Sequence, residues 1–113
     1  MKGTMLIFAI DEPMVVRELE GEPPTLPWLK EGIGGGYLEV VPHWTSIKVD
    51  GKEHRCWAFC DEDGKLKQLP VNNLATEIWD KCMRRTVGCG CGPDYLVGSI
   101  AVVYGDPEFM EAL

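Results

Sequence analysis

The chain has 113 residues, with 18 acidic and 11 basic side chains and a formal net charge of −7. This length suits one hydrophobic core, so we expect a single domain over residues 1–113, and an apolar fraction of 45% with a charged fraction of 26% excludes the composition of a disordered chain. The acidic excess repels nucleic-acid backbones and anionic membrane surfaces, so we expect neither as a direct partner.

The first predicted element is a β-hairpin over residues 4–19. Two runs rich in aliphatic residues, 4–10 and 14–19, are separated by Asp11-Glu12-Pro13, which has turn-forming chemistry. The first run is too short to span a membrane and has no small-residue cleavage site after it. It therefore predicts a buried strand of a cytoplasmic protein.

A helix over about residues 25–33 is predicted next. Gly21-Glu22-Pro23-Pro24 interrupts the strand pattern, Thr25 is placed to cap the helix, and Pro27 falls in its first turn. Glycines from position 32 onward end it. These glycines match no phosphate-binding motif, because such motifs require a helix after the glycines and a strand follows here.

The middle of the chain predicts an antiparallel meander over residues 37–69. Asp50-Gly51 between apolar runs is a strong two-residue hairpin signal, because both turn positions need positive φ. Gly64 can supply the same conformation in the loop that follows Asp61. The four strand-like runs are 37–41, 44–49, 52–60 and 65–69.

The remaining elements complete an α+β fold. Asn72 or Asn73 caps a second helix over about residues 73–85, with Glu77 and Lys81 paired one turn apart. Residues 96–104 are apolar on both alternating faces, as expected of a central strand, and Asp106 opens a short C-terminal helix. The predicted architecture is thus a mainly antiparallel sheet with two principal helices and a short third one.

Cysteine and histidine chemistry is weakly indicated. Five cysteines form no even framework of the kind found in small secreted domains, which predicts reduced thiols. Cys56 and Cys60 lie four residues apart in a strand, roughly 13 Å, too far to share a metal or a disulfide. The loop with Cys89 and Cys91 has no CxxC pair, and neither histidine, His43 or His54, has catalytic partners at motif spacing. We therefore predict no metal, no cofactor and no catalytic residue.

The start of the second helix is the best candidate for a ligand site. Asn72, Asn73 and Thr76 combine amide and hydroxyl groups with free backbone N–H groups at the positive end of the helix dipole, which suits a small anion such as a phosphate or a carboxylate. Tyr37 and Glu39 share one face of a strand and could border the same site. Helix capping alone also explains the asparagines.

An acidic protein-binding surface is a second candidate. Acidic residues are concentrated between positions 11 and 31, where a negative face could imitate a nucleic-acid backbone toward a basic protein. Its predicted members are Asp11, Glu12, Glu18, Glu20 and Glu22.

Four segments carry a family resemblance, in consistent order over about residues 36–105. They are Gly36-Tyr37-Leu38-Glu39-Val40-Val41-Pro42, Asp61-Glu62-Asp63-Gly64-Lys65-Leu66, Leu69-Pro70-Val71-Asn72-Asn73-Leu74-Ala75-Thr76 and Val97-Gly98-Ser99-Ile100-Ala101-Val102-Val103. Together they resemble an uncharacterised family of short proteins carried by phages, plasmids and related mobile elements. Residues 82–94 lie outside this pattern. The resemblance implies a mobile-element setting and brings no catalytic residues.

Together with the mobile-element setting that the resemblance implies, these observations favour a non-enzymatic accessory protein that binds and blocks or sequesters a host factor, such as one of an antiviral defence system. Its partner would be a host protein or a small anionic ligand, in the host cytoplasm. Two alternatives remain open: a small nucleotide-acting enzyme that uses His43, His54 or a cysteine, and a structural or assembly factor that forms homo-oligomers.

Overall fold

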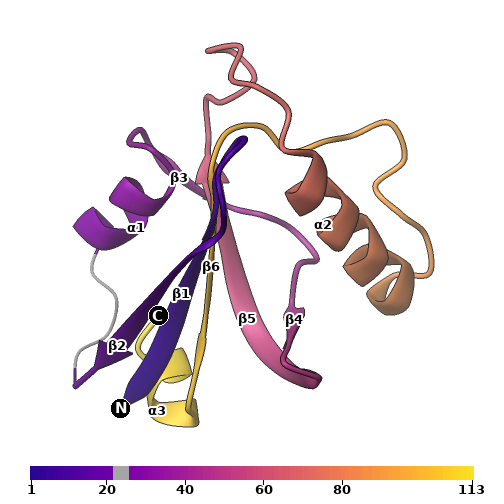
Figure 1. The fold of residues 1–113 in the computed structure, drawn as a ribbon. Helices are drawn as coiled ribbons and strands as arrows, with labels where there is room; N and C mark the ends of the chain where they lie inside the picture. The colour runs from indigo at the N-terminus through magenta and orange to yellow at the C-terminus, as the bar shows by residue number, and fades with distance from the viewer. Residues whose placement is uncertain (22–25) are drawn as a thin grey trace.

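The computed structural model describes residues 1–21 and 26–113. Its elements, in chain order, are β1 (Lys2–Phe8), β2 (Val15–Glu20), α1 (Leu26–Gly32), β3 (Leu38–Val40), β4 (Ser46–Val49), β5 (Lys52–Asp61), α2 (Asn73–Thr86), β6 (Ile100–Gly105) and α3 (Pro107–Glu111). The strands pair antiparallel in the order β2-β1-β6-β5-β3, and β4 also pairs with β5 (Figure 1). The predicted α+β class is confirmed. The predicted cap Thr25 lies outside the described residues.

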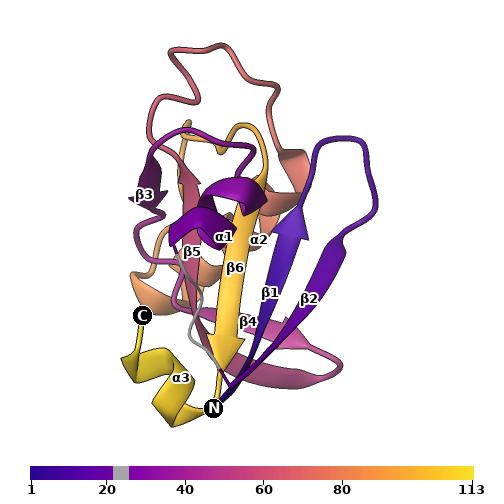
Figure 2. The same ribbon diagram turned by 90° about the vertical axis from the view of Figure 1, so that its left-hand side faces the viewer.

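Helices cover both faces of the sheet, with α1 and α3 on one side and α2 on the other (Figures 1 and 2). The alternation of β6 explains the two layers: Ala101 and Val103 pack with residues of α1 and α3, whereas Ile100 and Val102 pack with residues of α2. All four side chains are fully buried. The doubly apolar pattern that predicts a central strand is therefore confirmed, although the strand begins at residue 100 instead of 96.

Strands β3 and β4 both pair with β5, one after the other along its length. Leu38–Val40 pairs with the end of β5, and Ser46–Val49 pairs with its beginning. Between them the backbone bulges outward at His43, where φ is 63°, while Trp44 turns inward and is only 2% exposed. The predicted strand over residues 65–69 is wrong: residues 62–68 form turns. The meander thus ends at Asp61.

Local signals in the sequence fix the turns and the helix ends. Asp50 and Gly51 both have positive φ, at 51° and 80°, and Val49 pairs with Lys52 across them as a two-residue hairpin requires. The side chain of Asp106 accepts a hydrogen bond from the backbone N–H of Phe109, which caps α3.

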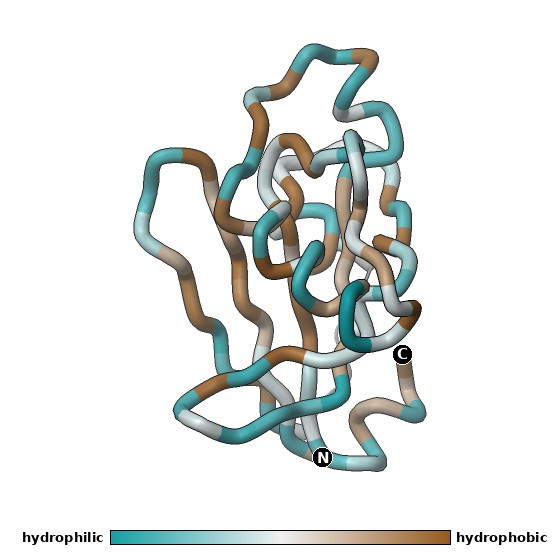
Figure 3. The backbone as a smooth tube through the Cα atoms, turned by 90° about the vertical axis from the view of Figure 1, so that its right-hand side faces the viewer, coloured by the Kyte–Doolittle hydropathy of each residue, from teal (hydrophilic) through white to brown (hydrophobic). Residues whose placement is uncertain are grey.

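The strands behind α2 are largely hydrophobic, whereas the first half of β5, which forms one arm of the β4–β5 hairpin, is hydrophilic (Figure 3). Within residues 1–21 and 26–113, no helix combines the length and hydropathy needed to cross a membrane.

Candidate functional site

Asn72, the central residue of the predicted ligand site, is used entirely inside the protein. Its side-chain oxygen accepts a hydrogen bond from the backbone N–H of Ala75 at 3.1 Å, and its amide nitrogen donates to the carbonyl oxygens of Phe8 and Gly98 at 2.8 and 2.9 Å. The residue is 3% exposed. It caps α2 and ties that helix to the ends of β1 and the loop before β6, so no donor of its side chain is left for a ligand.

The other predicted ligand residues do not converge with Asn72. The Thr76 hydroxyl donates to the carbonyl oxygen of Asn72 and accepts from the backbone N–H of Leu96. Tyr37 is 66% exposed, with the ammonium of Lys30 lying 5.6 Å from its ring centre. Asn73 lines a cavity of about 220 Å³ beside the β1–β2 loop, whereas Glu39 lines a different one. This geometry favours the capping role over an anion site.

The predicted acidic surface is spread along the β1–β2 hairpin. Asp11 and Glu12 are exposed in its turn, while Glu18 and Glu20 are exposed near its open end. Glu18 accepts a hydrogen bond from the Thr4 hydroxyl at 3.2 Å, and Glu20 lies 4.0 Å from the ammonium of Lys2. Glu22 lies outside the described residues. The structure therefore separates these acids into two groups at opposite ends of the hairpin.

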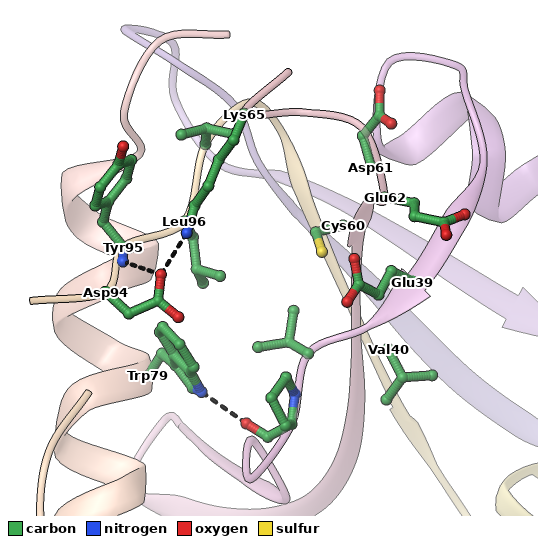
Figure 4. A pocket seen from close by; sticks show the side chains of 13 residues that line it. Glu39, Val40, Cys60, Asp61, Glu62, Lys65, Trp79, Asp94, Tyr95 and Leu96 are labelled. Carbon is green, nitrogen blue, oxygen red and sulfur yellow. Dashed lines mark hydrogen bonds and ion pairs between the residues drawn. The ribbon is translucent and has the colours of Figure 1, made fainter. Parts of the chain in front are cut away.

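A denser group of carboxylates lines a cavity of about 210 Å³ between β3, the end of β5, α2 and the loop before β6 (Figure 4). We call it the acidic cleft. Glu39 and Glu62 lie on one wall, and Asp94 and Tyr95 lie on the other (Figure 4). Its ionisable lining residues are Glu39, Asp61, Glu62, Asp94, Lys65, Cys60 and Tyr95.

Two of the four carboxylates have internal partners. Asp61, whose side chain is 4% exposed, accepts hydrogen bonds from the Lys67 ammonium at 2.8 Å and from the backbone N–H of Asp63 at 2.9 Å. Asp94 pairs with the Lys65 ammonium and accepts from the backbone N–H of Tyr95. Among the described residues, no ion pair is formed by Glu39 or Glu62, which leaves the cleft with a net negative charge.

Burial and hydrogen bonds shift the pKa values of four groups in the cleft, Asp61, Asp94, Lys65 and Cys60. Burial raises the pKa of Asp61, but the hydrogen bonds from Lys67 and Asp63 outweigh burial, so this pKa lies below its usual value. The pairing with Asp94 raises the pKa of Lys65, and the same contact lowers the pKa of Asp94. Burial, followed by the charges of Glu39 and Asp61, raises the pKa of Cys60 to about 11, so its thiol is protonated at neutral pH and is a poor nucleophile.

Two aromatic side chains, Trp79 and Tyr95, line the cleft. The indole N–H of Trp79 donates to the carbonyl oxygen of Pro42 at 2.7 Å, which joins α2 to the bulge between β3 and β4. The Lys65 ammonium lies 4.5 Å from the ring centre of Tyr95. A cationic side chain entering the cleft would meet the carboxylates of Glu39 and Glu62, which attract cations, beside a Tyr95 ring that Lys65 already covers.

Sequence reasoning finds part of this cleft. Glu39 is among the predicted ligand residues, but Asp61 and Glu62 are predicted only to lead into a loop between two strand-like runs, and Asp94 is not singled out. The register of the β3–β5 pair supplies the missing signal, because it places Glu39 opposite Cys60, directly beside Asp61.

The histidines and the remaining cysteines do not line the cleft, although the Cys91 thiol donates to the carbonyl oxygen of Asp94 at 3.3 Å. His43 is exposed on the bulge, and the ring of His54 stacks on Tyr104 with centres 4.5 Å apart. The backbone N–H of Cys91 donates to Asp80 at 2.9 Å, which holds the cysteine loop against α2. All five cysteines are free thiols, and the described part of the chain brings no three potential metal ligands together.

We expect Asp61→Asn to lower the free energy of unfolding at pH 7 by about 1–2 kcal/mol. This is less than a fully buried charged hydrogen bond contributes, because solvent screens the partly exposed Lys67. Because folding lowers the pKa of Asp61, the carboxylate contributes stability above its unfolded pKa of about 3.9 and loses it as the pH falls through the folded value. Urea unfolding of both proteins between neutral and acidic pH measures this. A difference that stays constant across the range would contradict the assignment.

No protein-family model, no curated protein and no solved structure matches this chain.

Proposed function

We propose that the protein is a non-enzymatic binding protein whose acidic cleft receives an arginine or lysine side chain from a basic partner protein. The observation that carries the proposal is the pair Glu39 and Glu62, which have no ion-pair partner in the described chain and lie on one wall of an aromatic-lined cavity. Charge complementarity of this kind governs both the rate and the specificity of protein association.

The pKa directions in the cleft support binding over catalysis. General acid–base chemistry at neutral pH needs a group whose pKa is moved toward 7. Here the pKa values of Asp61 and Asp94 are lowered, and those of Lys65 and Cys60 are raised, so each shift moves the group further from that range. A binding role requires only fixed charges.

The biological setting of the proposal comes from the resemblance to short proteins of phages and plasmids. We infer that the partner is a host factor in the cytoplasm, in the manner of accessory proteins that block antiviral defence. The acidic cleft replaces the start of α2 as the proposed contact site, since Asn72 and Thr76 are occupied by internal hydrogen bonds.

The test is a pull-down from host extract with the tagged protein, quantified by mass spectrometry. We expect Glu39→Gln/Glu62→Gln to reduce capture of the partner roughly tenfold, because it removes two unpaired charges from the contact. The matched control is Asp11→Asn/Glu12→Gln, which removes two charges from the hairpin turn. Complexes of the unchanged protein should weaken between about 50 and 500 mM salt.

Three outcomes decide the question. Loss with the cleft variant alone supports the acidic cleft, and loss with the hairpin variant alone would place the contact on the β1–β2 turn. A complex that tolerates both variants and high salt would overturn the proposal.

Self-association is a second candidate, favoured by the edge strand β2. This strand ends the sheet, and Val15 and Val16 are 42% and 51% exposed on its two faces. Exposed apolar edge strands can pair with a second copy. Native mass measured at several protein concentrations tests this, and a strict monomer would contradict it.

A further inference from the structure

A second and larger cavity, of about 730 Å³, lies on the α2 side of the sheet. We call it the α2 groove. It is bounded by α2, by β4 with its turn, and by β1 with the following loop. Figure 3 shows the backbone from this side of the molecule, the side on which α2 lies. Its apolar lining consists of Leu6, Phe8, Met14, Ile47, Val49 and Ile78.

The base of this groove is part of the main hydrophobic core. Leu6, Phe8 and Ile47 are 2%, 5% and 5% exposed and belong to the cluster that packs under α2. Met14, by contrast, is 45% exposed at the edge of the groove. Binding sites for small molecules are typically apolar concavities of about 300–1,000 Å³, so the α2 groove has the size and lining of such a site.

Basic side chains surround this apolar base. Four of the 11 lysines and arginines of an acidic protein line the groove, whereas Asp50 is its one acid among the described residues. The four cations are Lys48, Lys81, Arg84 and Arg85.

These cations keep donors for a ligand. The carboxylates that pair with Lys81, Arg84 and Arg85 are Glu77, Asp80 and Glu53, none of which lines the groove. Arg84 uses its Nε in this pairing and Arg85 uses one Nη, so each guanidinium retains further N–H groups. Lys48 forms no ion pair with any described residue.

We propose that the α2 groove binds a free small molecule with an apolar or aromatic body and an anionic head group. The body contacts Phe8, Met14 and Ile78, and the head group is held by Lys48 from β4 and by Lys81 and Arg85 from α2. Phosphate, sulfonate and carboxylate heads share the required chemistry, since each accepts charge-assisted hydrogen bonds. A membrane surface is a poor occupant, because the net charge of −7 repels anionic bilayers.

This site is independent of the acidic cleft. The two cavities share α2 but use different residues of it: Trp79 lines the cleft, whereas Ile78, Lys81, Arg84 and Arg85 line the groove. One face of the protein thus favours cations, and the other favours an anion attached to an apolar body.

Fluorescence titration with two probes tests the proposal. The anionic probe is 8-anilinonaphthalene-1-sulfonate, and the neutral probe of similar shape is N-phenyl-1-naphthylamine. We expect the anionic probe to bind roughly tenfold more tightly than the neutral one. Displacement by dodecanoate and by dodecyl phosphate, each below its micellar concentration, then compares carboxylate with phosphate heads.

Variants locate the site. Lys48→Gln/Lys81→Gln should weaken binding of the anionic probe roughly tenfold while leaving the neutral probe unchanged. The matched control, Lys30→Gln/Arg55→Gln, removes two cations that do not line the groove and should have no effect. Circular dichroism and urea unfolding verify that each variant is folded, because the anionic probe also binds loosely packed proteins.

Equal affinity for the two probes, or an equal loss in the groove and control variants, would overturn the proposal. Binding to anionic phosphatidylglycerol vesicles without binding to either monomeric probe would do the same and would indicate a membrane surface. The cleft variant Glu39→Gln/Glu62→Gln should leave probe binding intact, so failure of the groove and failure of the cleft are separable.

Discussion

Asn72→Ala should lower the free energy of unfolding by about 3–5 kcal/mol. The change removes the cap of α2 and leaves the carbonyl oxygens of Phe8 and Gly98 without their side-chain donor in a buried environment. A helix cap alone is worth about 0.5–2 kcal/mol, and each buried polar group left unpaired costs about 1–3 kcal/mol. Urea unfolding followed by circular dichroism measures the sum.

Two further variants separate the roles of this side chain. Asn72→Asp keeps the capping oxygen but places a carboxylate against two carbonyl oxygens, so it should be at least as destabilising at neutral pH. Because the repulsion raises the folded pKa of the new acid, the variant should recover stability as the pH falls below that value and the acid is protonated. Asn73→Ala, at the exposed neighbour, is the control and should cost little. Equal effects at both positions would contradict the role assigned to Asn72.

Local chemistry explains why so much of the fold follows from the sequence. Asp50-Gly51 fixes its turn because few residue pairs accept two positive φ values, and Asn72 and Asp106 cap their helices through their own side chains. The apolar run that contains β6 predicts a central strand because only such a strand buries both faces. Each of these signals acts within a few residues.

The errors arise where tertiary contacts decide. Residues 65–69 have a strand-like pattern, but they belong to turns closed by backbone hydrogen bonds, from which Lys67 reaches Asp61 and Lys65 reaches across to Asp94. Leu74 is an apolar residue in the first turn of α2, yet it is 55% exposed, whereas the next residue, Ala75, is fully buried. Neither outcome is visible in the local pattern.

The sites are less predictable than the fold for the same reason. The acidic cleft combines β3, the end of β5, α2 and the loop before β6, and the α2 groove combines β1, β4 and α2. Short-range patterns suggest the asparagines at the start of α2 as a site because amides beside a helix end are familiar anion ligands. Those patterns cannot show that the side chain of Asn72 forms its hydrogen bonds with Phe8, Gly98 and Ala75 inside the protein.

Gly36→Ala should destabilise the protein by about 3 kcal/mol through two separate costs. Gly36 has a φ of 88°, a backbone conformation that residues other than glycine adopt at a cost of about 1–2 kcal/mol. A Cβ atom at this position would also lie 2.6 Å from a carboxylate oxygen of Asp61 and 2.9 Å from the Lys67 ammonium nitrogen. The ion pair between Lys67 and Asp61, whose carboxylate lines the acidic cleft, would have to move.

Gly35→Ala carries only the first cost, the backbone strain, because Gly35 has nearly the same φ, 92°, and no atom within 4 Å of the added Cβ. The difference between the two variants therefore measures the second cost, the displacement of Asp61 and Lys67. We expect this control to lose only about 1–2 kcal/mol in urea unfolding. A larger loss for Gly36→Ala means that Asp61 and Lys67 are held rigidly, so that the cleft is formed before a partner arrives and little ordering is required on binding. Equal losses would mean that the ion pair yields freely, and the acidic cleft would then have to be shaped by its partner.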